Sequence, residues 1–385
     1  MEKLYYTDSY LRKIECTVIW VEGNLVRTDR TIFYPEGGGQ RGDSGKLGAF
    51  RVINTVKDAD GDSLLVMEEG ARIEAGDVLD LELDWKSRYN GMVIHTCQHM
   101  LSGLLYSMYG IGTLAVHMGE DYLTIETDRE TVAESTIAGL VGRANEVIAE
   151  NHRVSGVEME HGQAVALGLR RPVKVSGPVR IVEIEGVDRI ACGGVHVSHT
   201  SEIRLAVFTG HEQVRGHERL VFRCGEGAVL NAVSDSRTVH GLCSILSCTD
   251  DQITGKTEAL LSENQSLKAR NSSLLERNAL YRLTERLSEK TACYVADDDE
   301  DLGATGRCVE HFADIALCVL QQKNDRFVWL IALKGCFAKD FGRIRQNLLV
   351  PFNARGGGKG PLYQGIMEKC NPEEFFNAFR LAAGL

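Results

Sequence analysis

Two short segments of the 385-residue chain carry side chains that can bind a metal ion. In the first, His95-Thr-Cys-Gln-His99, two histidines stand at positions i and i+4, which lie on one face of a helix about 5–6 Å apart. In the second, Cys192-Gly-Gly-Val-His196, adjacent glycines disfavour a helix and favour a tight loop that brings thiolate and imidazole together. One cysteine and three histidines suit Zn²⁺. We therefore expect one zinc ion per chain, bound by His95, His99, Cys192 and His196.

The sequence leaves the role of this metal open. Four protein ligands are typical of a closed, structural zinc that joins two halves of a domain, whereas a catalytic zinc usually keeps an open position. A catalytic site with these ligands requires one loosely held ligand or a five-coordinate metal.

Composition and charge limit the class of protein. The chain has 43 Lys and Arg against 54 Asp and Glu, a net charge of −11, with 43% apolar and 25% charged residues. These values are ordinary for a soluble protein of two or three domains and exclude a disordered chain or a uniformly basic nucleic-acid binder. No secretory signal pattern or run of about 18 apolar residues is present. We expect a cytoplasmic protein with no membrane partner, whose 11 scattered cysteines are mostly reduced.

Hydrophobic patterning predicts an α+β fold in four segments. Residues 1–88 alternate apolar and polar over short runs broken by glycine, which predicts a small β-barrel. Residues 89–225 predict an α+β domain that contains the zinc site, with helices over about 87–109 and 131–150 and one of several strands near 173–175.

The remaining two segments are a helical one and a small domain. Residues 226–290 lack proline and are expected to be helical throughout. Residues 291–385 predict an α/β domain. Its expected elements are strands over 315–320 and 327–333, a glycine-rich loop over 356–360 and a closing helix over 372–383.

A seven-residue repeat marks the helical segment. Leucine or tyrosine recurs at Leu260, Leu267, Leu274 and Tyr281, and asparagine follows four residues later, at Asn264, Asn271 and Asn278. This spacing is typical of a coiled-coil hairpin or of a homodimer seam in which buried asparagines set the register. The alternative is a long helix that packs on its own domain.

Four ordered motifs carry a family resemblance over nearly the whole chain. They are the segments 29–40 (DRTIFYPEGGGQ), 95–103 (HTCQHMLSG), 117–121 (HMGED) and 192–196 (CGGVH). With them, the chain resembles the AlaX family of alanyl-tRNA editing proteins, free-standing relatives of the editing domain of alanyl-tRNA synthetase. The tail over 355–365 is similar to the glycine-rich domain that closes the longer members.

The resemblance implies a trans-editing hydrolase that deacylates tRNA(Ala) mischarged with serine, with glycine as a further candidate. By resemblance, Thr31 contacts the serine hydroxyl, while Gln98 and His117 are polar groups of the pocket. The zinc either activates water or holds the substrate amino group and leaves water activation to the terminal ribose. The plainer alternatives are a β-branched strand residue for Thr31 and a surface histidine for His117.

Candidate RNA contacts lie in three segments of the chain. The turn with Gly38, Gly39 and Gln40 lets a backbone approach RNA closely, or is a plain turn. Five basic residues against one acidic occur over 339–359, including Arg343, Arg345, Arg355 and Lys359, and a second basic cluster comprises Arg170, Arg171, Lys174 and Arg180. A non-catalytic, zinc-stapled, oligomeric RNA-binding protein is the alternative function.

Overall fold

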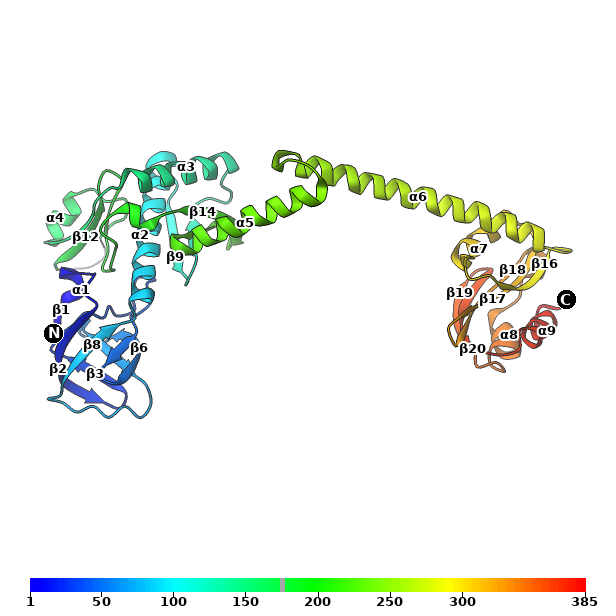
Figure 1. Cartoon of the computed structure of the whole chain (residues 1–385), viewed down its shortest axis with the longest axis horizontal. Coiled ribbons are helices and arrows are strands. Elements are labelled where there is room, and N and C mark those ends of the chain that lie inside the picture. The colour runs from blue at the N-terminus through cyan, green and yellow to red at the C-terminus, as the bar shows by residue number, and fades with distance from the viewer. Residues whose placement is uncertain (174–176) are drawn as a thin grey trace. The chain divides into compact units, whose positions relative to one another are not determined.

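The computed structural model describes residues 1–173 and 177–385, which form two compact units, Met1–Gly241 and Leu242–Leu385 (Figure 1). Lys174 and most of the strand expected near 173–175 lie outside the described residues. Within the described part of the chain, no helix combines the length and apolar character needed to cross a membrane.

The first unit begins with a closed six-stranded barrel, as the alternating pattern predicted. Its strands, in barrel order, are β2 (Lys13–Glu22), β3 (Leu25–Thr28), β7 (Ser63–Met67), β6 (Phe50–Lys57), β5 (Gly45–Leu47) and β8 (Val78–Leu83). Val18, Val26 and Leu65 fill its interior, whereas Ile19 and Ile53 face out, because side chains alternate across a strand. Beside the barrel, β1 (Glu2–Lys3) leads into α1 (Leu4–Thr7) and pairs in parallel with β4 (Arg30–Thr31).

Helix α2 (Trp85–Tyr109) runs through the core of this unit. It begins at Asp84, whose carboxylate accepts the N–H of Ser87, and ends at Gly110 in the left-handed conformation (φ 64°). All residues from Met92 to Leu105 are buried, so both predicted histidines of this helix are enclosed.

Two antiparallel sheets and α3 (Glu134–Glu150) pack around α2. The first sheet has the order β14 (Ala206–Val214), β15 (His217–Cys224), β10 (Leu123–Thr127) and β9 (Thr113–Met118). The second has the order β11 (Val154–Met159), β12 (Val179–Ile184) and β13 (Asp188–Ala191), with α4 (His161–Ala166) packed on β12. A 3₁₀ turn, η1 (Thr200–Ile203), follows the loop after β13.

The expectation that residues 226–290 are helical throughout is wrong at two points. Helix α5 (Gly225–Leu246) is separated from α6 (Ile253–Arg286) by Ser247, at φ 50°, and by the turn η2 (Asp250–Gln252), and α6 ends at Arg286, before residue 290. Thr249 and Gln252 form a capping box that starts the second helix afresh. The local capping chemistry therefore outweighs the general helical propensity of this segment.

The second unit is a five-stranded sheet with helices. Its strands, in order, are β16 (Thr291–Ala296), β17 (Ile315–Lys323), β18 (Arg326–Lys334), β20 (Leu362–Glu368) and β19 (Arg355–Lys359). Its helices and turns are α7 (Leu302–Cys308), η3 (Val309–His311), η4 (Gly335–Phe337), α8 (Phe341–Ile344), η5 (Arg345–Leu349) and α9 (Pro372–Ala383). Strands were predicted at β17 and β18 and a helix over 372–383, and the structure has all three.

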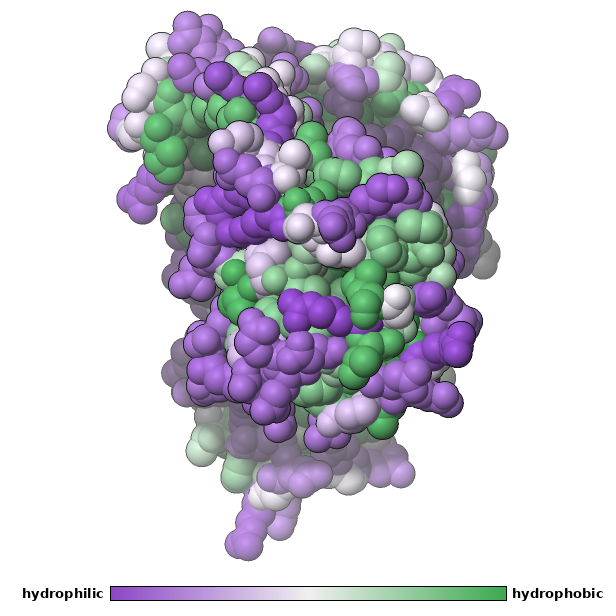
Figure 2. All heavy atoms as spheres, turned by 90° about the vertical axis from the view of Figure 1, so that its right-hand side faces the viewer, coloured by the Kyte–Doolittle hydropathy of each residue, from purple (hydrophilic) through white to green (hydrophobic). Residues whose placement is uncertain are grey.

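The glycine-rich segment expected to be a loop is the edge strand β19. A Cβ on Gly356 would lie 2.6 Å from the Trp329 ring, and one on Gly365 of the neighbouring strand 2.5 Å from it. The glycines thus let this indole lie flat against two strands, a role that glycine content alone does not reveal. Figure 2 shows apolar side chains interspersed with polar ones on the face of this unit nearest the viewer.

Candidate metal centre

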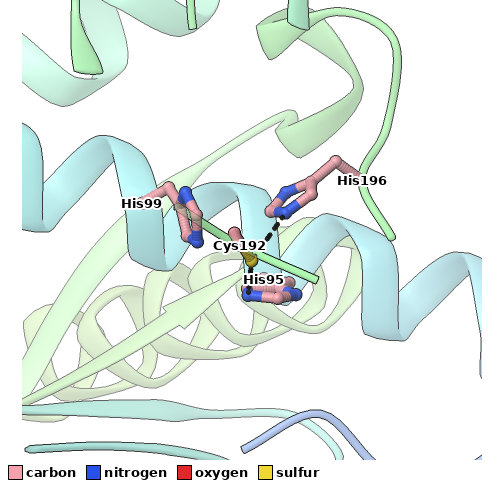
Figure 3. A group of neighbouring side chains, drawn as sticks. All are labelled: His95, His99, Cys192 and His196. Atoms are coloured by element: carbon pink, nitrogen blue, oxygen red, sulfur yellow. Dashed lines mark hydrogen bonds between the residues drawn. The ribbon is translucent and has the colours of Figure 1, made fainter. Parts of the chain in front are cut away.

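The four predicted metal ligands converge in the first unit (Figure 3). Helix α2 supplies His95 and His99, and the loop after β13 supplies Cys192 and His196. One ligand atom from each lies within 4.8 Å of the others. The Cys192 Sγ lies 3.4 Å from His95 Nε2 and 3.6 Å from His196 Nε2, as the dashed lines of Figure 3 mark. The cluster predicted from the sequence is thus assembled and could hold a metal ion.

Hydrogen bonds direct two of the imidazoles toward the centre. The Gln40 Oε1 lies 2.9 Å from His95 Nδ1 and also accepts the N–H of Val195 at 3.1 Å. Thr96 donates its hydroxyl to the Met92 carbonyl, so its oxygen is free to accept from His196 Nδ1 at 3.1 Å. Both Nδ1 atoms therefore carry the proton, and both Nε2 lone pairs face Cys192.

The third imidazole has a looser partner. His99 Nδ1 lies 4.0 Å from the Asp188 carboxylate, beyond hydrogen-bond distance, and Arg170 holds that carboxylate with two N–H groups at 2.8 and 3.1 Å. A Cβ on Gly103 would come within 2.6 Å of the Asp188 Cβ, so this close approach requires glycine.

Burial keeps the three histidines in the form that binds metals. It lowers the pKa of His95 to about 3, with the Arg180 charge as a second cause. Burial also sets the pKa of His99 and that of His196 well below the usual value, and neighbouring imidazoles add to the effect. Neutral imidazoles at physiological pH are the ligand form. Burial raises the pKa of the Cys192 thiol, and a bound cation would favour its thiolate.

The loop that carries Cys192 is shaped for close approach. A Cβ on Gly194 would lie 2.1 Å from His95 Cε1, so only glycine fits at this position. One guanidinium nitrogen of Arg180 donates to the carbonyls of Cys192 (3.1 Å) and Gly194 (2.7 Å), and the Tyr6 hydroxyl donates to the Gly193 carbonyl (2.9 Å). These contacts fix the position of the loop.

The other pocket residues expected from the sequence have different surroundings. Thr31 is fully buried at the end of β4, where its Oγ1 accepts the N–H of Phe33 at 3.0 Å. Gln98 is buried on α2, and its amide donates to the Ser102 hydroxyl at 2.8 Å. His117 is exposed on β9 with its ring beside Tyr122, and among the described contacts it makes no hydrogen bond or ring contact with the four ligands.

The residues expected to contact RNA divide into two groups. Gly38 and Gly39 form a turn at positive φ closed by two backbone hydrogen bonds between Gly37 and Gln40, while the Gln40 side chain is buried against His95. In the second unit, four cations are exposed, and within the described residues none of them forms an ion pair: Arg343, Arg345, Arg355 and Lys359.

Sequence reasoning missed a buried ion pair next to the site. Arg88 of α2 and Asp43 of the barrel are both almost fully buried and form a multiply hydrogen-bonded pair. Arg88 also donates to the carbonyls of Ile32 (2.5 Å) and Ser9 (3.2 Å). The pair ties the strand region next to Thr31 to the helix that carries the histidines. No sequence pattern indicated it, because Asp43 and Arg88 are 45 residues apart and meet only after folding.

Comparison with known proteins identifies relatives of this chain. A family model described as the threonyl and alanyl tRNA synthetase second additional domain matches residues 179–220, which include Cys192 and His196. The alanyl-tRNA editing protein AlaX-M of Methanosarcina mazei is 35% identical over 220 residues, 53% of this chain and 88% of that protein. The chain therefore belongs to the AlaX family of alanyl-tRNA editing proteins.

Two further relatives show how far the likeness extends. The alanyl-tRNA editing protein AlaX-L of Pyrococcus horikoshii is 28% identical over 394 residues, 98% of this chain and 97% of that protein. An alanine–tRNA ligase of Saccharolobus islandicus is 30% identical over 276 residues, 68% of this chain but only 31% of the ligase. The likeness to AlaX-L thus includes the C-terminal unit.

Proposed function

We propose that this protein is a metal-dependent trans-editing hydrolase that deacylates tRNA(Ala) mischarged with serine, with glycine as a second substrate. The observation that carries the proposal is the buried cluster of His95, His99, Cys192 and His196 in a chain of the alanyl-tRNA editing family. Hydrolysis by a separate site answers a chemical need, because a pocket built for alanine cannot reject glycine sterically and discriminates weakly against an added hydroxyl.

The donor set fits zinc. Three neutral imidazoles and one thiol whose donor atoms lie within 4.8 Å of one another match the ligands and softness of Zn²⁺. When bound, zinc would supply a Lewis acid that lowers the pKa of water or holds an amino group. Gln40 and Thr96 would orient His95 and His196, and Arg180 would hold the loop of Cys192 in place.

Thr31 is our candidate for serine recognition. Its hydroxyl oxygen accepts the N–H of Phe33, which leaves the hydroxyl proton for an acceptor such as the serine oxygen. A buried hydroxyl that loses its partner when alanine replaces serine disfavours the alanyl ester. We keep Gln98, buried on the ligand helix, as a group that orients substrate or water, and His117 as a more distant, exposed candidate.

A deacylation panel tests this proposal. Purified protein with one bound zinc should hydrolyse Ser-tRNA(Ala) and leave Ala-tRNA(Ala) largely intact, and Thr31→Val, which keeps the shape but removes the hydroxyl, should reduce this preference about 10-fold or more. Equal hydrolysis of both esters would disprove serine specificity. Binding of both tRNAs without hydrolysis would favour a non-catalytic RNA-binding protein.

We also propose that the protein is a homodimer that joins through α6. Leu260, Leu267, Leu274 and Tyr281 are all exposed in the single chain, although they repeat every seven residues. The second unit packs on other residues of the same helix, Ala279 and Leu283, so the leucine face is left without a partner among the described residues. The exposed cations Arg343, Arg345, Arg355 and Lys359 would contact the tRNA backbone.

A further inference from the structure

A cleft of about 1050 Å³ in the first unit opens onto the metal centre. Its lining includes Cys192 and Gly193 of the ligand loop, Tyr6 of α1, and charged residues of the second sheet and of the segment between α4 and β12. Cys192 is the partly exposed ligand, whereas His95, His99 and His196 are buried. The cleft therefore connects solvent with one residue of the candidate metal cluster, Cys192.

The size of the cleft exceeds what an amino-acid ester needs. Sites that enclose a drug-sized ligand have volumes of roughly 300–1,000 Å³. The space here is slightly larger than that range, and a seryl group fills only a small part of it. The remaining volume is available to the part of the substrate that is attached to the amino-acid ester.

The lining has the chemistry of a single-stranded RNA site. Arg171 is exposed at the cleft, and one of its guanidinium nitrogens donates to the carbonyls of Thr113 (2.5 Å) and Leu114 (3.0 Å). The Arg180 guanidinium lies 5.0 Å from the centre of the Tyr6 ring, which is 39% exposed. Guanidinium planes and aromatic rings both stack on unpaired bases, and arginine attracts phosphates.

One acidic residue also lines the cleft. Glu158 of β11 is exposed and stands opposite Arg180 in the strand register, whereas Arg180 Nη1 donates to the carbonyls of the ligand loop. Within the described residues Glu158 forms no ion pair. Its carboxylate would repel a nearby phosphate, so the cleft contains residues that should affect RNA binding in opposite directions.

We propose that this cleft binds the single-stranded 3′ end of the aminoacyl-tRNA, with Arg171 facing its phosphates and the Tyr6–Arg180 pair stacking on a base. The inference rests on the proposed function, since it assumes that the ester at the metal centre is attached to RNA. It adds a subsite formed by side chains that do not bind the metal.

Binding of two RNA probes tests the cleft directly. The first probe is an end-labelled, uncharged tRNA(Ala) transcript, and the second is the same transcript without its three 3′-terminal nucleotides. Wild-type protein should bind the complete transcript more tightly, and Arg171→Gln should remove most of this difference. The slope of log affinity against log salt should fall by about 0.7 in Arg171→Gln, the value for one single-strand phosphate contact.

Matched variants separate this role from a loss of folding. Arg171→Lys should keep the salt slope, and Arg72→Gln, which removes an exposed cation of the barrel that does not line the cleft, should change nothing. Glu158→Gln should bind the complete transcript more tightly at low salt. Tyr6→Leu should weaken binding roughly 5-fold or more through lost stacking, whereas Tyr6→Phe should retain most of it.

The possible results distinguish a failure of the cleft inference from a failure of the proposed function. If wild-type protein hydrolyses Ser-tRNA(Ala) but Arg171→Gln and Tyr6→Leu leave both KM and 3′-end binding unchanged, the cleft inference is wrong and the function stands. If wild-type protein hydrolyses no ester but still loses its 3′-end preference in Arg171→Gln, the inference holds and the function is wrong. A rise in KM at constant kcat in Arg171→Gln supports both.

Discussion

The chemistry of single side chains decides whether the site can hold a metal. Cys192 supplies the only sulfur donor of the cluster, and its Sγ lies within 3.6 Å of two imidazole nitrogens. We expect Cys192→Ala to lose both bound zinc, measured by plasma mass spectrometry, and deacylation. Cys97→Ala, which removes a buried thiol of the same helix outside the cluster, is the control and should retain zinc. Stoichiometric zinc in Cys192→Ala would refute the ligand assignment.

The supporting amide of Gln40 gives a second prediction. It accepts from His95 Nδ1 and so fixes which ring nitrogen is free for the metal. Removing such a partner typically costs 10–100-fold in metal affinity, so Gln40→Ala should bind zinc about 10- to 100-fold more weakly in a competition with a chromophoric chelator. Gln213→Ala, at an exposed glutamine of β14, should not change the affinity. Unchanged affinity in Gln40→Ala would contradict its positioning role.

The low pKa of His95 predicts how the metal-free protein responds to acid. Its pKa is about 3 in the folded state, below the ordinary value of 6.5, so between these values the unfolded chain binds a proton that the folded chain does not. The free energy of unfolding should therefore fall as the pH drops from 6.5 toward 3. His95→Gln lacks this titration, so its melting temperature should depend less on pH between 7 and 5. An equal pH dependence of the melting temperature in both proteins would contradict the lowered pKa of His95.

The barrel and helix α2 are joined by the buried pair of Asp43 and Arg88. Removing one partner of a buried pair leaves an uncompensated charge, which typically costs about 3–5 kcal/mol. Asp43→Asn should reduce the free energy of unfolding by about this amount in denaturant titration. Asp80→Asn breaks a solvent-exposed pair with Lys13 and should lower the free energy of unfolding far less, because exposed ion pairs contribute little to stability. Similar losses in the two variants would show that the buried pair does not join the elements.

The elements also show which features a sequence can reveal. The barrel, helix α2 and the convergence of His95, His99, Cys192 and His196 were predictable, because their signals are short-range: period-2 alternation, an i, i+4 histidine pair and a CGGVH loop. The pair of Asp43 with Arg88 and the contacts of Arg180 with the ligand loop were not, since they join separate segments only after folding. Strand β19 was missed because glycine is depleted in strands unless a neighbour such as Trp329 requires it.

At the scale of the whole molecule, the heptad face of α6 predicts self-association. Leu267→Lys with Leu274→Lys in the full chain should convert a dimer to a monomer in light scattering, because both exposed leucines lie in the proposed seam. Ser273→Lys, at an exposed position between the heptad face and the packed face, should leave the oligomeric state unchanged. A dimer in the double variant, or a monomeric wild type, would contradict the seam.

The net charge of −11 has to be considered together with the distribution of the cations. Arg171 and Arg180 line the cleft, and exposed cations lie on the second unit, so local attraction for a phosphate backbone coexists with overall repulsion. Such a distribution favours binding that weakens steeply with salt and allows rapid release of product.

The dependence of hydrolysis on the metal tests the central claim most directly. Ser-tRNA(Ala) deacylation should be measured for the wild-type protein as purified, after removal of metal by a chelator, and after addition of one equivalent of Zn²⁺, with circular dichroism recorded at each step. The expected result is hydrolysis that disappears with the metal while the fold persists and that returns with zinc. Undiminished hydrolysis by folded, metal-free protein would contradict a catalytic metal centre at His95, His99, Cys192 and His196.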